Sequence, residues 1–476
     1  MTGRPTADAP TGAPVDGNRG DLERRLGTID AAAVVVSNVI GSGILLMPAI
    51  VARMAPDYWA LMAAWLAGGL LAFAGAMAYA ELATMRPRAG GEYVYLRAAY
   101  GPLPAFLTGW TSFVAGFSGA VAAAAVGLAG FLGNLVPAFG DATPWAALPL
   151  GVLSLTISPQ NLTAIAIIAT FSVVHALGLG PGRFVQNTLA AIKVLGLVGF
   201  AVAGLLWGQG APAAASAAPA AASAAGGVSI SGWLLALVPV MFSYSGWNAA
   251  AYVSEEIREP SKRLPRALAL GTAIVVLVYL AMNAVYLHAL PMATLTGLEL
   301  RVIDAAADQL FGGAASGALL VLSILITAGT ISAMVFAGPR VYYAMARDGL
   351  FVPAAARVHP RWRTPVVAIA AQGLWSAVLV LSGTFAQLAS YTGFAIVLFA
   401  GIAVAAVFVL RYREPDAPRP FKAWGYPLAP ALFTVMSAVM VVNQVQREPG
   451  PAAAGLVVIG CGIPIYFFLR HRARSA

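Results

Sequence analysis

The chain contains 476 residues, of which 60% are hydrophobic and only 10% are charged, and its mean hydropathy is +0.80. Because soluble domains carry about 25% charged residues, this composition excludes a soluble globular protein and indicates one with many membrane spans. The net charge of +9 does not indicate a nucleic-acid partner, since the basic residues lie in short loops between apolar runs. The single cysteine, Cys461, allows neither an intramolecular disulfide nor a metal cluster built on cysteine.

The chain begins with residues 1–20, which are rich in proline, glycine, alanine and threonine and predict a disordered tail. They lack the charged-then-apolar order of a signal peptide, so we expect the first span to be retained. The apolar runs that follow last about 20 residues without alternation, which predicts membrane-spanning helices rather than strands. We predict twelve spans, at residues 30–52, 58–83, 102–127, 160–178, 184–208, 232–254, 265–289, 315–342, 365–382, 386–410, 427–445 and 452–470.

The basic residues predict the orientation of these spans. With the N-terminus inside, the inner loops and tails hold 24 of the 28 lysines and arginines, and the outer loops hold only Arg53, Arg301 and Arg447. This asymmetry predicts cytoplasmic termini and an even number of spans in a plasma membrane, and the alanine-rich composition favours a bacterial inner membrane. Residues 209–230 contain the uncharged low-complexity run GAPAAASAAPAAASAAGG, which we interpret as an external flexible linker.

Two spans are interrupted at their centres. In the first span, VVVSNVIGSGILLMPAIVA is broken by the residues from Gly41 to Gly43. In the sixth span, VPVMFSYSGWNAAAYVSEE is broken by the residues from Ser243 to Gly246. Corresponding breaks in two five-span halves indicate an inverted-repeat transporter. A Gly-x-Gly alone more often means close helix packing, but the paired breaks favour a site where freed N–H groups receive a carboxylate and freed carbonyls receive an ammonium.

Several segments resemble known permeases. DLERRLGTIDAAAVVVSNVIGSGILLMPAIVA and PRAGGEYVYLRAAYGPLPAFLTGW resemble the amino-acid permeases of the APC superfamily. MFSYSGWNAAAYVSEEIREPSKRLPRALALGTAIVVLVYLAMNAVYLHAL and GPRVYYAMARDGLFVPAAARVHPRWRTPVVAI resemble the L-type amino acid transporter (LAT) branch. The resemblance implies an all-α polytopic protein of the LeuT type. Its first inverted repeat would occupy residues 21–208, its second residues 231–411, and spans 11 and 12 with the C-terminal tail residues 412–476.

The resemblance also implies the substrate-binding positions. These are Ile40, Gly41, Ser42, Gly43, Ile44, Phe242, Ser243, Tyr244, Ser245 and Asn248. The glycine-serine-glycine segment matches the receptor for the substrate carboxylate, the interrupted part of span six meets the amino group, and Phe242 closes over the substrate from outside. Tyr279 matches a supporting polar position in span seven. The family often has glycine at the position of Ser245, so the larger residue favours small substrates.

Lys193 lies about ten residues into the fifth span, where insertion of an ammonium costs about 2.5–3.5 kcal/mol. Snorkelling to the interface is the simpler interpretation of such a lysine, but its depth favours a buried residue with partners. The resemblance implies that its ammonium replaces a sodium ion and links the first span to the eighth, where Ser332 matches the facing position. This argues against sodium coupling and leaves exchange or proton-coupled uptake.

The remaining polar residues narrow the substrate class. No acidic residue lies in the middle of spans one, three, six, eight or ten, so a cationic side chain would lack a counter-charge. Trp110 is a further candidate for the pocket, because the third span flanks it in the implied fold. Glu81, Glu255 and Glu256 lie near the inner surface, where a gate, a structural ion-pair network and ordinary solvated charges remain alternatives.

We therefore predict a secondary transporter of small neutral L-amino acids, with no metal site and no cofactor. The alternatives are a permease for small amines or polyamines, which predicts an acidic pocket residue, and a non-transporting amino-acid sensor, which predicts a long soluble domain. An enzyme is not expected, since the chain lacks HExxH, GxSxG and paired membrane aspartates. The loop between spans three and four has no cysteine, so no disulfide-linked subunit is expected.

Overall fold

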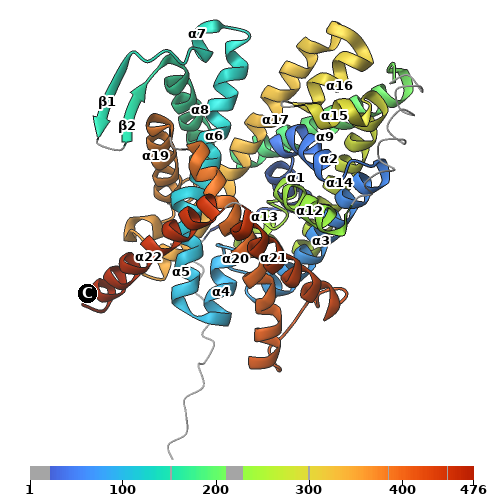
Figure 1. The fold of residues 1–476 in the computed structure, drawn as a ribbon. Helices are drawn as coiled ribbons and strands as arrows, with labels where there is room; N and C mark the ends of the chain where they lie inside the picture. Colours follow the sequence, from blue (N-terminus) through green and yellow to red (C-terminus); the bar gives the residue numbers. More distant parts are fainter. Residues whose placement is uncertain are drawn as a thin grey trace, which may run out of the picture.

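The structure is a computed structural model, and it describes residues 22–150, 153–210, 229–298, 301–383, 385–447 and 449–475. Over these residues the chain forms a bundle of helices, with one small hairpin projecting from it (Figure 1). The predicted all-α polytopic fold is confirmed. The predicted N-terminal tail lies outside the described residues, as does nearly all of the predicted linker.

Each predicted span corresponds to one helix or to a pair of helices. In chain order these are α1 (Thr28–Val39) with α2 (Ser42–Met54), α3 (Tyr58–Met85), α5 (Pro102–Thr111) with α6 (Phe117–Gly133), α8 (Pro159–Ala176), α9 (Leu179–Trp207), α12 (Ile230–Ser243) with α13 (Ala249–Tyr252), α14 (Pro260–Ala289), α17 (Ser316–Ala337), α19 (Val366–Ser382), α20 (Phe385–Arg413), α21 (Leu428–Arg447) and α22 (Pro449–Ser475).

Among the described residues, nine helices are long and apolar enough to cross a membrane, and the bent pair α1 and α2 makes a tenth candidate. The helices α12 and α19 are apolar but shorter. The twelve predicted spans are thus ten candidates of sufficient length and two short apolar helices. α12 is short because its helix ends at the interruption that the sequence places in span six.

Short elements connect the spans. These are α4 (Glu92–Tyr100), the π-helical turn η1 (Ser112–Gly116), α7 (Pro137–Gly140), η2 (Ser254–Glu256), α15 (Met292–Gly297), α16 (Val302–Phe311), η3 (Gly312–Ala315), α18 (Pro339–Arg347) and η4 (Pro353–Ala356). The loop between the third and fourth spans adds a hairpin that the sequence analysis did not predict. Its strands β1 (Ala146–Leu150) and β2 (Leu153–Ile157) pair antiparallel, with Ala146 opposite Ile157, and β2 lies beside α19.

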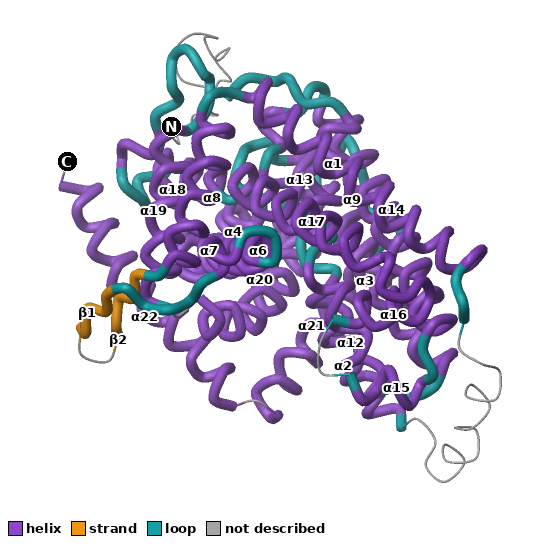
Figure 2. Tube along the Cα trace, turned by 90° about the horizontal axis from the view of Figure 1, so that it is seen from above, coloured by secondary structure: helices purple, strands orange, loops and turns teal. Residues whose placement is uncertain are grey.

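The two halves of the chain interlock at their broken spans. α1 packs against α14, α9 and α17, while α2 packs against α12. Seen from above, α1, α13, α17, α9 and α14 lie side by side in one part of the bundle (Figure 2). Every broken segment is therefore surrounded by other helices, which is the condition under which irregular backbone is tolerated at membrane depth.

Candidate functional site

The first break lies between α1 and α2, whose axes differ in direction by 47°. α1 ends at Val39 and α2 begins at Ser42, so the last carbonyls of one helix and the first N–H groups of the other lack their usual partners. Ser42 is exposed at this point, whereas Ile40 and Ile44 on either side are fully buried. The break therefore places polar backbone groups in a mostly buried, apolar surrounding, with the Ser42 side chain exposed.

Lys193 on α9 satisfies the freed carbonyls of α1. Its side chain is fully buried, and its Nζ donates to the carbonyl oxygens of Ser37 at 2.9 Å and Ile40 at 2.7 Å. A third bond runs to the Oγ1 of Thr330 at 2.9 Å. Three acceptors match the three donors of an ammonium group. Gly329 makes room for this side chain, because a Cβ there would lie 2.6 Å from the lysine Cε.

The prediction that Ser332 is the partner of Lys193 on the eighth span is corrected. The residue on that span that bonds to Lys193 is Thr330. Residues two apart on a helix point about 200° away from each other, so only one of them faces α1. Ser332 instead accepts from His175 Nε2 at 2.9 Å and donates to Gln186 Oε1 at 3.1 Å. It belongs to a second link between α17, α8 and α9.

The second break follows α12, which ends at Ser243, and it touches the first. A Cβ at Gly43 would lie 2.8 Å from the Cα of Ser243, so the close approach requires glycine. Gly246 has φ +99°, a conformation that side chains disfavour, and packs against Asn38. The hydroxyl of Tyr279 on α14 lies 2.9 Å from the Val39 carbonyl and 3.0 Å from the Ser243 carbonyl. One hydroxyl thus joins both breaks.

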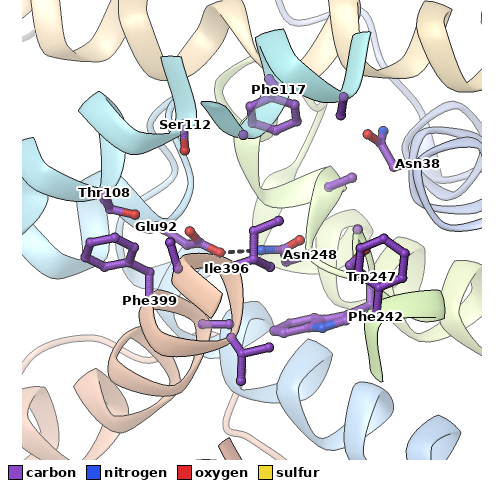
Figure 3. Close-up of a pocket in the computed structure, with 18 of the residues that line it drawn as sticks. Asn38, Glu92, Thr108, Ser112, Phe117, Phe242, Trp247, Asn248, Ile396 and Phe399 are labelled. Carbon is purple, nitrogen blue, oxygen red and sulfur yellow. Dashed lines mark hydrogen bonds between the residues drawn. The ribbon is translucent and has the colours of Figure 1, made fainter. Parts of the chain in front are cut away.

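A cavity of about 220 Å³ opens beside the second break. Its walls come from α1, α4, α5, η1, α6, α12, α13, α17, α20 and α21 and from the residues between α12 and α13 (Figure 3). Aromatic side chains, among them Phe117, Trp247 and Phe399, form much of the wall, and a few polar groups interrupt it. A mostly apolar cavity with few polar groups is typical of a small-molecule site.

The cavity contains a carboxylate that the sequence analysis missed. Glu92 lines it with only 9% of its surface exposed, and its Oε1 accepts from Asn248 Nδ2 at 2.6 Å (Figure 3). Burial raises the pKa of this carboxyl above its ordinary value. A sequence signal existed, because Glu92 shares one face of α4 with the buried Leu96 and Ala99 at helical spacing. The premise that no carboxylate faces the pocket is therefore corrected.

The predicted site residues fall into two groups. Those that line the cavity are Phe242, Ser245 and Asn248. Those that lie at the breaks or behind them are Ile40, Gly41, Ser42, Gly43, Ile44, Lys193, Ser243, Tyr244 and Tyr279. Trp110 faces elsewhere, since its Nε1 donates to the Val458 carbonyl of α22 at 3.0 Å.

The three glutamates that the sequence analysis expected near the inner surface take part in ion pairs with residues distant in sequence. Glu256 and Arg340 form a fully buried pair with contacts of 2.7 and 3.0 Å. Glu255 accepts from Arg347 at 3.0 Å and from the backbone N–H of Ala89. Removing one partner of a buried pair costs about 3–5 kcal/mol, so the Glu256 pair holds η2 to α18.

Glu81, near the C-terminal end of α3, shows the same pattern. It accepts two bonds from Arg411 at 2.8 and 2.6 Å and one from the Ala423 N–H at 2.7 Å. These partners lie on α20 and in the loop that follows it. Of the alternatives left open by the sequence, the structure thus places all three glutamates in ion pairs that join distant segments of the chain.

Comparison with known proteins agrees with this arrangement. The model of the family described as "Amino acid permease" matches residues 26–463, which is most of the chain. The chain is 28% identical to the serine/threonine exchanger SteT of Bacillus subtilis over 95% of its own length and 98% of that protein. It is 27% identical to the large neutral amino acids transporter small subunit 2 of mouse, over 97% and 83% of the two chains. It is 28% identical to the human b(0,+)-type amino acid transporter 1, over 94% and 88%.

Proposed function

Because this chain belongs to the amino acid permease family and amino acid transport follows from that membership, we propose that it carries small neutral L-amino acids without sodium. The proposal extends to alternating access in a plasma membrane with both termini cytoplasmic. The observation that carries it is the ammonium of Lys193, bonded to two carbonyls at the α1 break. A fixed positive charge at that point leaves no need for a sodium ion.

The α2 N-terminus supports recognition of a carboxylate. Its first N–H groups have no acceptor within the helix, and they carry the positive end of the helix dipole. Such a terminus binds anions without a charged side chain. Facing it, Ser243 to Ser245 supply carbonyls for an ammonium, so the two breaks together match the two ends of an α-amino acid.

The cavity supports a small substrate. Ser245 and Asn248 narrow it with polar side chains, and its size is about 220 Å³. Phe242 lines it with 44% of its surface exposed, which leaves the phenyl ring free to swing over a bound molecule. The name of the Bacillus relative, a serine/threonine exchanger, agrees with small neutral substrates.

The helices in contact with each broken span are the basis of the proposed transport cycle. Substrate enters from outside, binds in the cavity beside the breaks and is covered by Phe242. The broken spans and their neighbours α3 and α14 then rock against the remaining helices and open inward. Lys193 ties α1 to α9 and α17 in the state seen here, with bonds of 2.7–2.9 Å, and release of these bonds accompanies the movement.

The test is uptake by the purified full chain in proteoliposomes. Vesicles are preloaded with unlabelled alanine or left empty, and labelled amino acids and amines are offered with sodium or with choline. We expect alanine, serine or threonine to enter equally well in both salts. Protein-free vesicles are the control. Dependence on sodium would contradict the proposal, and so would failure of every neutral amino acid to enter.

A small-amine permease is the second candidate, and one observation favours it. Glu92 places a carboxylate on the cavity wall, which is the counter-charge that an amine substrate requires. The same panel separates the two candidates, because entry of ethanolamine or a polyamine without any amino acid would establish the second.

As a further part of the proposal, the transporter works without a disulfide-linked subunit, since its one cysteine, Cys461, lies in the last span.

A further inference from the structure

Glu92 lies in an unusual place for a carboxylate. It begins α4, directly after Gly90 and Gly91, which both have positive φ and turn the chain sharply. The turn brings the side chain to the cavity wall, within reach of Thr108 on α5 and of Asn248. The carboxylate is thus buried among three elements while remaining beside the space that a substrate would occupy (Figure 3).

The groups that face Glu92 are neutral. Asn248 donates to it at 2.6 Å, and the Tyr252 hydroxyl of α13 bonds both to it and to Asn248. Tyr79 of α3 and Tyr95 of α4 are the other titratable neighbours. No lysine, arginine or histidine in the described part of the chain forms an ion pair with it, in contrast to Glu81, Glu255 and Glu256.

A buried carboxylate that has no cation to pair with is costly in its charged form and favours the protonated form. Its pKa is raised by burial, so it holds a proton at higher pH than a solvated glutamate would. The buried Lys193 is not among the residues that line the cavity, and its three donors are directed at α1 and α17. Of these two groups, Glu92 is the one placed to exchange a proton with the cavity.

We propose that Glu92 is a proton-binding site on the wall of the substrate cavity and that one proton travels with each amino acid. In the outward-open state the carboxylate takes a proton from the external solution and becomes neutral. After the transporter opens inward, the carboxyl releases the proton to the cytoplasm and regains its charge. With a neutral amino acid, each complete cycle moves one positive charge inward, because the carboxyl is neutral on the loaded step and negatively charged on the empty return. This inference rests on the proposed transport function.

The experiment measures proton and substrate flux together. Proteoliposomes enclosing a pH-sensitive dye receive an inward proton gradient, and labelled alanine uptake is recorded beside internal acidification. The variants are Glu92→Gln and, as a matched control, Glu414→Gln, whose carboxylate pairs with Arg86 at 2.6 Å at the protein surface. We expect Glu92→Gln to lower the number of protons per alanine by at least about tenfold, and Glu414→Gln to leave it unchanged.

A second variant tests the same site without removing the carboxyl. Tyr252→Phe deletes a hydroxyl that stabilises the charged form of Glu92, so the pKa of Glu92 rises. We expect the pH of half-maximal uptake to move upward by about one pH unit. This measurement decides the matter if Glu92→Gln does not fold, and an unmoved midpoint overturns the proposal.

The remaining outcomes separate this proposal from the transport function. If the wild type exchanges alanine without acidification, or if Glu92→Gln acidifies vesicles as the wild type does, the proton site is overturned and transport stands. If folded Glu92→Gln loses alanine exchange as fully as proton flux, Glu92 serves binding instead and the proposal is overturned. If Glu92→Gln loses only the uptake of amines, Glu92 is a counter-charge for amines, and the proton-site proposal is overturned as well. If the wild type moves no amino acid or amine, both proposals fail.

Discussion

The free backbone carbonyls at the two breaks have different kinds of hydrogen-bond donors. At the first, two carbonyls of α1 converge on the ammonium of Lys193, and Thr330 completes its shell. At the second, the Ser243 carbonyl meets only the neutral hydroxyl of Tyr279, which also reaches Val39. Both sets of partners are fully buried. The first break therefore depends on a charge, whereas the second depends on a hydrogen bond shared with the first.

The two links differ in strength and in the helices that they join. Hydrogen bonds to charged groups contribute about 1.5–3 kcal/mol, and neutral ones about 0.5–1.5 kcal/mol. The charged link ties α1 to the neighbouring helices α9 and α17, while the neutral one ties the two broken spans to each other through α14. Variants at the two breaks should consequently differ in the size of their effects.

Loss of the charged link gives the largest expected effect. Lys193→Ala removes the ammonium donor from the buried carbonyls of Ser37 and Ile40, and among the described residues only the Ile40 carbonyl keeps another side-chain donor, the Thr330 hydroxyl at 3.2 Å. The loss of a donor to a buried carbonyl costs about 1–3 kcal/mol. We expect alanine transport in proteoliposomes to fall by at least about tenfold. Size-exclusion profile and yield from membranes serve as controls for insertion. Normal transport by this variant would remove the linking role.

The contact between the breaks is tested by two glycines of one motif. Gly43→Ala places a Cβ 2.8 Å from the Cα of Ser243, so backbone has to move. A Cβ at Gly41 would have its nearest neighbour, the Thr330 Oγ1, at 3.4 Å, which is an ordinary contact. We expect transport to fall about tenfold or more for Gly43→Ala, because overpacking costs about 1–3 kcal/mol, and far less for Gly41→Ala. Equal activities would mean that the breaks separate freely during transport.

The neutral link at the second break is tested by Tyr279→Phe, which keeps the ring and deletes the hydroxyl. Two carbonyls then lose a shared donor. We expect the free energy of unfolding to fall by about 1 kcal/mol, measured as a lower melting temperature in detergent, and transport to fall less than in Lys193→Ala. A melting temperature equal to that of the wild type contradicts the assigned bond.

The smallest expected effects compare two positions on α17. Thr330→Val keeps the shape of the side chain but removes an acceptor of the ammonium, at about 1 kcal/mol. Ser332→Ala removes a group bonded to His175 and Gln186, behind the first break. We expect alanine transport to fall about fivefold for Thr330→Val and less for Ser332→Ala. A larger loss of transport for Ser332→Ala than for Thr330→Val would support Ser332 as the partner of Lys193, which is the role that the resemblance implied.

Local patterns in the sequence determined much of this protein. Apolar runs long enough to cross a bilayer predicted the ten candidate spans and the two short apolar helices. The glycine-rich and serine-rich interruptions located both breaks, because backbone preferences are encoded within a few residues. The depth of Lys193 in its span likewise predicted a buried cation with polar partners. These features follow from composition and spacing along one helix at a time.

The contacts between helices were decided only by the tertiary structure. Which side of α17 faces Lys193 depends on the rotation of that helix against α1, so Thr330 replaced Ser332. Trp110 was placed against α22 by the same kind of packing. Glu92 lies far from either break along the chain and reaches the cavity because Gly90 and Gly91 turn α4 toward it. A linear pattern records none of these rotations, since they result from packing between distant segments.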